Sequence, residues 1–324
     1  MRGRHRITIQ DKRIRYDFSV KRNITVIKGD SATGKTQLIE MLAAYSADGE
    51  NSGIELACDK KCVVLTKERW VENLRMIKDS IVFIDEGSLF VTSHDFAREL
   101  DGSDNYYVLI TRDSLFNLPY SVNEIYGIRK SQKYSGLKRT YNELYRIYED
   151  TVDSSIDEEL SVVTEDSNSG YEFWNGICNK HNIKCISADG KSNIANIIDR
   201  NKQEDYLVIA DGAAFGCEME RITKLVKSGS RVILYLPESF EWLILSSDLH
   251  GDPEIKGEIA KPEDYIDSEK YISWERYFTH RLTEISRGTY LKYNKSKLND
   301  NYLKDREIQV LLEIVPDRVR SLIL

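Results

Sequence analysis

The chain has 324 residues, of which 41% are hydrophobic and 31% are charged, and its net charge is −7. This composition is typical of a globular protein and excludes a largely disordered chain, and the length is sufficient for two domains. The acidic balance argues against nonspecific coating of nucleic acid by the whole surface, although a local basic patch could still bind it.

The sequence predicts a cytoplasmic protein without a membrane span. Its uncharged apolar stretches are only as long as a strand. The basic start, residues 1–6, leads into an alternating strand rather than into the apolar core of a signal peptide. Five cysteines, an odd number, suggest free thiols in a reducing compartment.

The first half of the chain predicts an α/β fold. Alternation of polar and apolar residues indicates a hairpin over 6–20, placed before a first core strand at 24–27. A helical pattern opens at residue 37. The elements expected after it are strands at 54–57, 62–66, 81–84 and 107–111, helices at 70–77 and 96–100, and a tyrosine-rich antiparallel extension at 124–148.

The strongest motif follows the first core strand. Residues 29–36 read G-x-x-x-x-G-K-T between a predicted strand and a predicted helix, which is the context that a phosphate-binding loop requires. Lys35 would reach the β- and γ-phosphates, and the Thr36 hydroxyl would bind Mg²⁺. The alternative is a glycine turn before an ordinary helix. The residues expected to bind the nucleotide are Gly29, Asp30, Ser31, Ala32, Thr33, Gly34, Lys35 and Thr36.

A second motif is the apolar run 81–84 followed by two carboxylates. It predicts a buried parallel strand that delivers its acids at the carboxyl end, where α/β sheets bind ligands. Asp85 would hold Mg²⁺ through its water shell, and Glu86 would polarise the attacking water. The alternative is a strand that ends in a solvated acidic turn. The two motifs together predict a site for ATP or GTP with Mg²⁺.

Asp85 stands only 49 positions after Thr36, too close for the long helical arm of ABC-type ATPases. Over about residues 20–130 the chain resembles the AAA-type and related additional-strand ATPases. This resemblance implies a sensor residue at the end of the next core strand, where Thr111 stands, and a catalytic role for Arg112 at the γ-phosphate of its own or a neighbouring subunit. A surface ion pair is the alternative for Arg112. The predicted N-terminal hairpin is more usual in ABC-like heads, so the superfamily stays open.

An acidic segment at 149–159 indicates a domain boundary, which divides the chain into residues 1–155, 156–260 and 261–324. The middle region repeats strand and helix, and right-handed crossovers then predict a four-stranded parallel sheet. The last region is helical. The middle elements are strands at 160–164, 183–187, 206–210 and 231–236, with helices at 170–181, 192–202 and 218–227.

Acidic residues follow the first three strands of the middle region, at Glu165, Asp189 and Asp211, and could converge on Mg²⁺. Over about 160–245, including the loops 168–170 and 190–194, this region resembles the Toprim fold of topoisomerases, primases and OLD-type nucleases. In that family a glutamate after the first strand and an Asp-x-Asp after the third bind catalytic Mg²⁺. The resemblance therefore implies Glu165 and Asp211 as metal ligands.

Two positions depart from the Toprim pattern. Asp166 stands where the family usually has glycine, and the third motif reads Asp211-Gly212-Ala213 without its second aspartate. A lost carboxylate should cripple cleavage by a two-metal site. An inactive metal-binding or scaffolding domain therefore stays open beside an active nuclease. The acids that could replace the missing one are Glu218, Glu220, Glu238 and Glu241.

The C-terminal helices interleave basic and aromatic residues in a way that can bind a phosphate backbone and stack bases. The alternative is an amphipathic helix with a solvated basic face. The residues concerned are Arg276, His280, Arg281, Arg287, Lys292, Lys295 and Lys297, among Tyr277, Phe278, Tyr290 and Tyr293.

These patterns predict a P-loop ATPase with hairpin additions, joined to a degenerate Toprim-like domain and a helical tail. ATPases coupled to Toprim domains recur in phage defence and on mobile elements. The resemblance therefore implies an ATP-driven switch that acts on or senses nucleic acid, with a homo-oligomer or a protein partner left open. The alternatives are a nucleotide-dependent binding module with negligible turnover and a Mg²⁺-dependent nuclease.

Overall fold

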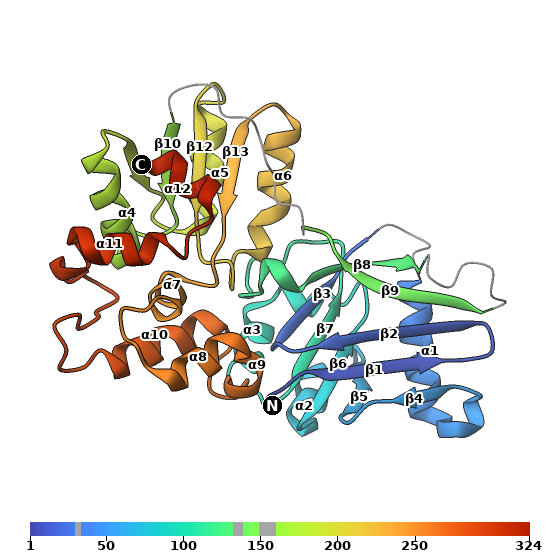
Figure 1. The fold of residues 1–324 in the computed structure, drawn as a ribbon. Coiled ribbons are helices and arrows are strands. Elements are labelled where there is room, and N and C mark those ends of the chain that lie inside the picture. Colours follow the sequence, from blue (N-terminus) through green and yellow to red (C-terminus); the bar gives the residue numbers. More distant parts are fainter. Residues whose placement is uncertain (30–33, 132–138, 149–159) are drawn as a thin grey trace. The chain divides into compact units, whose positions relative to one another are not determined.

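The computed structural model describes residues 1–29, 34–131, 139–148 and 160–324 (Figure 1). The chain forms two compact units, which we call unit 1 (Met1–Glu149 with Glu263–Ser273) and unit 2 (Asp150–Pro262 with Trp274–Leu324). The boundary expected at residue 155 lies outside the described residues. The expected separate region 261–324 is instead divided between the two units, because residues 263–273 pack with unit 1.

Unit 1 is built on a nine-stranded mixed sheet in the order β4-β1-β2-β9-β8-β3-β7-β6-β5. From β8 to β5 all neighbouring strands are parallel, whereas β1 is antiparallel to β2 and β4, and β8 is antiparallel to β9. The expected hairpin, core strands and antiparallel extension are confirmed. The strands are β1 (His5–Gln10), β2 (Ile14–Val20), β3 (Ile24–Ile27), β4 (Glu55–Ala57), β5 (Lys61–Val64), β6 (Ser80–Ile84), β7 (Tyr106–Ile110), β8 (Ile125–Lys130) and β9 (Thr140–Arg146).

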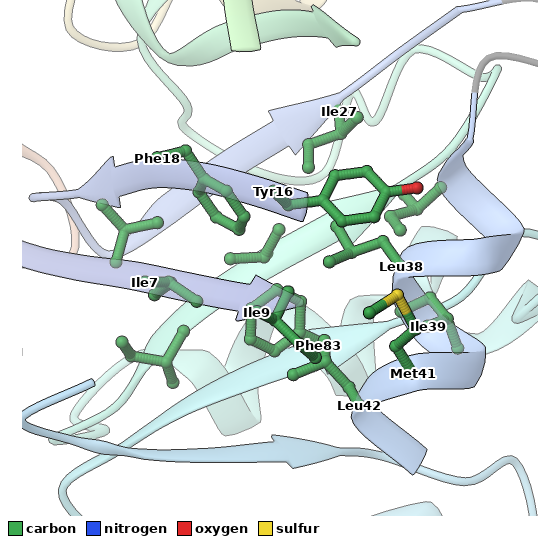
Figure 2. Packing of buried hydrophobic residues seen from close by; sticks show 14 of the residues in the cluster. Ile7, Ile9, Tyr16, Phe18, Ile27, Leu38, Ile39, Met41, Leu42 and Phe83 are labelled. Carbon is green, nitrogen blue, oxygen red and sulfur yellow. The ribbon is translucent and has the colours of Figure 1, made fainter. Parts of the chain in front are cut away.

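Helix α1 (Lys35–Asp48) lies inside the curve of this sheet. Strands β4 and β5 stand at opposite ends of the strand order, yet only residues 58–60 connect them, so the sheet must curl until its edges approach each other. The helix packs against both β1 and β5. Its apolar residues recur at helical spacing and form one buried face (Figure 2), made by Leu38, Ile39, Met41 and Leu42.

That face meets side chains of the sheet, among them Ile9, Tyr16 and Phe83 (Figure 2). Removal of each such side chain from water stabilises the fold by roughly 1.5–3 kcal/mol. The core therefore fixes the helix against the sheet. The other helices of unit 1 are α2 (Trp70–Met76) and α3 (His94–Leu100), while the short α9 (Pro262–Tyr265) begins at the unit boundary.

Unit 2 has a four-stranded, fully parallel sheet in the order β11-β10-β12-β13, as the sequence predicts. Its strands are β10 (Leu160–Thr164), β11 (Lys184–Ser187), β12 (Asp205–Ile209) and β13 (Arg231–Tyr235), connected by α4 (Ser169–Lys180), α5 (Lys191–Arg200) and α6 (Met219–Lys227). The helices that follow are α7 (Phe240–Ser246), α8 (Pro253–Ala260), α10 (Trp274–Ile285), α11 (Asp305–Leu312) and α12 (Asp317–Ile323).

The expected α/β class is confirmed. In the part of the chain that the structure describes, no helix has the length and apolarity to cross a bilayer.

The burial of one face of α1 predicts that substitutions on this face destabilise unit 1. Leu38 is fully buried, so Leu38→Ala is expected to lower the free energy of unfolding of unit 1 by about 2–5 kcal/mol. Gln37→Ala, on the exposed side of the same helix, serves as the control and is expected to change it by less than about 0.5 kcal/mol. Urea unfolding measures both. Equal effects of the two substitutions would contradict the enclosure of this face.

Candidate functional site

The carboxyl ends of β3, β6 and β7 lie side by side in unit 1. Strand β7 stands between β3 and β6 and is parallel to both. Because parallel strands end at the same edge of a sheet, Gly29, Asp85 and Thr111 follow their strands at one edge. The structure therefore brings together three segments that the sequence analysis assigned to one nucleotide site.

The phosphate-loop motif has the expected flanks, with β3 before Gly29 and α1 directly after Gly34. Gly29 and Gly34 have φ values of 141° and 97°, which side chains with a Cβ rarely adopt. Helix α1 begins at Lys35, directly after Gly34, and Thr36 is exposed in its first turn. The other expected loop residues, Asp30, Ser31, Ala32 and Thr33, lie outside the described residues.

The Lys35 ammonium lies between the Gly29 carbonyl and the acidic residues that follow β6. Its side chain is only 5% exposed, and Nζ donates a hydrogen bond to the Gly29 carbonyl. Nζ also lies 3.9 Å from Oε2 of Glu86. Burial of a charge is costly unless opposite charge or polar atoms surround it. Here the Glu86 carboxylate and the Gly29 carbonyl supply these partners.

The Glu86 carboxylate connects two cations. Oε1 lies 2.5 Å from Nε of Arg112, while Oε2 faces Lys35. The preceding Asp85 accepts a hydrogen bond from the Glu86 amide, at 2.7 Å from its Oδ1. The structure thus shows Arg112 in an ion pair, the alternative that the sequence left open. A role for Arg112 at a γ-phosphate stays a prediction.

Thr111 follows β7 directly and is buried. Its amide donates to the Ile27 carbonyl at 3.2 Å, and its hydroxyl accepts from the Asp113 amide at 3.0 Å. The hydroxyl therefore holds the turn that leads away from the strand. The sensor role implied for Thr111 stays a prediction.

Sequence reasoning missed two residues that contact this edge. Tyr16 of β2 donates its hydroxyl hydrogen to the Gly34 carbonyl at 2.7 Å, and Lys28 donates to the Ser114 hydroxyl at 3.3 Å. Neither residue belongs to a motif, and nothing in the local sequence signals either contact. Both contacts follow from the tertiary arrangement of the sheet.

In unit 2, Glu165 and Asp211 lie together beyond β10 and β12. The Asp211 amide donates to Oε2 of Glu165 at 3.1 Å, and the Phe240 amide donates to Oδ1 of Asp211 at 3.2 Å. Burial raises the pKa of Glu165 to about 7. Burial, with Glu275, Glu165 and Glu241 nearby, raises the pKa of Asp211 well above its ordinary range. These two carboxyls are therefore kept from full ionisation.

Lys295 supplies positive charge to the same cluster. Its Nζ lies 2.5 Å from Oε1 of Glu275 and 3.9 Å from Oε1 of Glu241, which also accepts from the Tyr293 hydroxyl at 2.7 Å. Burial alone would lower the pKa of Lys295, but the carboxylates of Glu241 and Glu275 raise it above its ordinary value. The ammonium is therefore a built-in counter-ion.

A cavity of about 30 Å³ is lined by Glu165, Asp211, Glu241, Tyr293 and Lys295. That volume holds a few waters or a small ion but no nucleotide. Among the described residues, no group of three or more Asp, Glu, His or Cys side chains is arranged to hold a metal ion. The structure brings Glu165 and Asp211 together, as the Toprim resemblance implies. It also places the Lys295 ammonium beside them, where the resemblance implies a metal ion.

The other expected acids of unit 2 have different places. Asp189 is exposed and does not line the cavity, so the expected convergence of three strand-end acids is wrong for this residue. Of the candidates to replace the missing aspartate, Glu241 lines the cavity. Glu218 and Glu220 are instead paired with cations on their own helical segment, Arg221 at 3.2 Å and Lys224 at 2.7 Å.

The C-terminal aromatic residues are mostly inside unit 2. Tyr277, Phe278 and Tyr293 are buried, whereas Tyr290 is 56% exposed. Arg281 is bound to Glu258, with Nη2 2.8 Å from Oε1. Three of the four rings that were predicted to stack on bases are therefore buried and not accessible to a nucleic acid.

Comparison of the chain with protein-family models, with curated proteins and with solved structures finds no match. The interpretation of both sites therefore depends on their residues and geometry.

The raised pKa of Glu165 predicts that the stability of the fold depends on pH. Below about pH 4.5 the carboxyl is protonated in both the folded and the unfolded chain, and between there and about pH 7 only the unfolded chain loses the proton. Folding stability should therefore fall as the pH rises through this window. Glutamine cannot ionise, so the Glu165→Gln protein is expected to lose up to about 3 kcal/mol less stability than the wild type over this pH range.

Thermal unfolding in EDTA at pH 5 and pH 8 measures this effect, with Glu254→Gln on the exposed side of α8 as the control. The same carboxyl is near several other titratable groups, namely Lys191, Glu275, Asp166 and Asp211. The difference in pH dependence between wild type and variant therefore reports on the whole cluster rather than on one residue. The same pH slope in wild type and Glu165→Gln would contradict the prediction.

Proposed function

We propose that unit 1 binds and hydrolyses ATP with Mg²⁺, and that the chain is an ATP-driven switch that acts on or senses nucleic acid. The observation that carries this proposal is the approach of Lys35, at the start of α1, to Glu86, at the end of β6. A buried ammonium, a catalytic carboxylate and a helix start that follows a glycine loop are the elements that phosphoryl transfer to water requires.

The strand order supports the same proposal. Strand β7 lies between the strand before the loop and the strand that ends in Asp85 and Glu86. This is the position of the extra strand in the additional-strand ATPases that the sequence resembles. GTP is a second substrate compatible with the site, since the described residues at the edge would contact phosphates rather than a base.

Each residue has a defined task in the proposed reaction. The Lys35 ammonium would bind the β- and γ-phosphates, and Thr36 and Asp85 would hold Mg²⁺, which would neutralise phosphate charge. Glu86 orients a water and accepts its proton. The Arg112 guanidinium, 2.5 Å from Glu86, fixes the direction of that carboxylate.

We further propose that unit 2 is a Toprim-like scaffold rather than an active nuclease. Two acids after neighbouring parallel strands support the Toprim-like part of the proposal. Against nuclease activity stand the missing second aspartate and the ion pair of Lys295 with Glu275. The Lys295 ammonium also acts on Asp211, where its charge would repel a divalent cation.

Substitutions at Lys35 and Glu86 separate binding from turnover. Lys35→Ala is expected to lower ATP affinity by at least about tenfold, because two phosphates lose a buried cation. Glu86→Gln is expected to keep ATP binding and to lower kcat by about 10²–10⁴-fold, because the base is lost. Calorimetric titration and phosphate release measure the two quantities.

Lys60→Ala and Glu143→Gln, which change ion-paired surface residues of unit 1, are the matched controls and should behave as wild type. Hydrolysis by Glu86→Gln at the wild-type rate would exclude Glu86 as the base. Tight nucleotide binding without phosphate release by the wild type would favour a regulatory binding module.

The scaffold role of unit 2 is tested with supercoiled plasmid DNA and Mg²⁺ or Mn²⁺. We expect no nicking by the wild type, since Lys295 neutralises the acid cluster. Cleavage that both Glu165→Ala and Asp211→Ala abolish would contradict the scaffold role and establish a metal-dependent nuclease. The control is Glu254→Ala, which removes an exposed acid of the same unit and should leave any cleavage unchanged.

A further inference from the structure

The Tyr16 hydroxyl joins the N-terminal hairpin to the start of α1. Tyr16 belongs to β2, is 1% exposed, and donates to the Gly34 carbonyl at 2.7 Å. Figure 2 shows its ring among the core side chains, with the hydroxyl directed toward the start of α1. A side chain of the hairpin thus reaches the last residue before the helix.

Asn142 completes this contact from a neighbouring strand. It stands opposite Tyr16 in the β2–β9 ladder, is buried, and its side chain is hydrogen-bonded to the Tyr16 hydroxyl. A Cβ at Gly34 would lie 2.8 Å from the Tyr16 hydroxyl and 3.4 Å from Nδ2 of Asn142. Gly34 is therefore seated closely against these two side chains, in a conformation with positive φ.

The contact controls the direction of an amide as well as of a carbonyl. The Gly34 carbonyl and the Lys35 N–H belong to one planar trans peptide and point in opposite directions. The carbonyl points along α1, where it accepts from both the Tyr16 hydroxyl and the Leu38 amide, the latter at 3.0 Å. The Lys35 N–H consequently points away from the helix body, where a helix start binds anions.

We infer that Tyr16 is a positioning residue for the β-phosphate, because its hydrogen bond to the Gly34 carbonyl orients the Lys35 amide toward that group. This inference rests on the proposed nucleotide function of unit 1. Asn142 acts through Tyr16, since it orients the hydroxyl that holds the carbonyl.

The hydroxyl is suited to this task at every physiological pH. Burial raises the pKa of Tyr16 to about 12, so the group stays protonated and keeps its hydrogen to donate. Replacement of tyrosine by phenylalanine removes the donor and leaves the ring in the core. The effect on nucleotide binding should therefore be the same at pH 6.5 and at pH 9.

The test compares Tyr16→Phe with Tyr106→Phe in the full chain. Tyr106 is a matched control, because it is 2% exposed, lies in unit 1, and donates to the backbone carbonyl of Gly3 at 3.3 Å. Titration calorimetry with Mg²⁺·ATP and Mg²⁺·ADP measures Kd, and thermal unfolding without nucleotide measures stability. For Tyr16→Phe we expect both nucleotides, which share the β-phosphate, to bind about two- to tenfold more weakly.

The same comparison distinguishes this inference from the proposed function. No binding of either nucleotide by the wild type contradicts the nucleotide site itself. Binding by the wild type with an unchanged Kd in Tyr16→Phe overturns only the role of Tyr16. Equal weakening in Tyr16→Phe and Tyr106→Phe also overturns it, because any buried hydroxyl would then have the same effect.

A second variant covers the case in which Tyr16→Phe does not fold. Asn142→Ala leaves the tyrosine in place and removes the partner of its hydroxyl. We expect it to weaken both nucleotides in the same direction, by a smaller factor than Tyr16→Phe. A wild-type Kd for a folded Asn142→Ala together with an unfolded Tyr16→Phe would count against the inference.

Discussion

The packing of α1 inside the curled sheet is the contact on which the site of unit 1 depends. Leu38 and its apolar neighbours on the helix are buried against side chains of several strands, so the helix cannot turn or slide without opening the core. Its first residues, Lys35 and Thr36, are therefore held at the edge where β3, β6 and β7 end. The hydrophobic core thus determines the placement of the polar groups.

The hairpin has a role in this arrangement beyond adding strands. Through β2 it supplies Tyr16, which enters the same core and reaches the Gly34 carbonyl. One residue therefore contributes apolar area to the core and a hydrogen bond to the helix start. The glycine at position 34 is required for the same reason, because a side chain there would collide with the tyrosine hydroxyl.

The two strand-end sites differ in their balance of charge. In unit 1 one buried lysine, Lys35, lies 3.9 Å from the Glu86 carboxylate and donates to a backbone carbonyl. In unit 2 the acids are buried together, and Lys295 already provides the opposite charge. Desolvation drives both outcomes, since a buried charge needs a partner or must be neutralised by a proton.

The local elements could be predicted from the sequence: most strands and helices, the parallel sheet of unit 2, and the motifs that end at Thr36 and Glu86. These follow from patterns within a few residues, where backbone geometry and hydrophobic periodicity act. The contact of Tyr16 with Gly34, the position of Lys295 among the acids of unit 2 and the burial of Phe278 could be seen only in the tertiary structure. Such contacts depend on strand order and on packing between distant segments, which local sequence patterns do not encode.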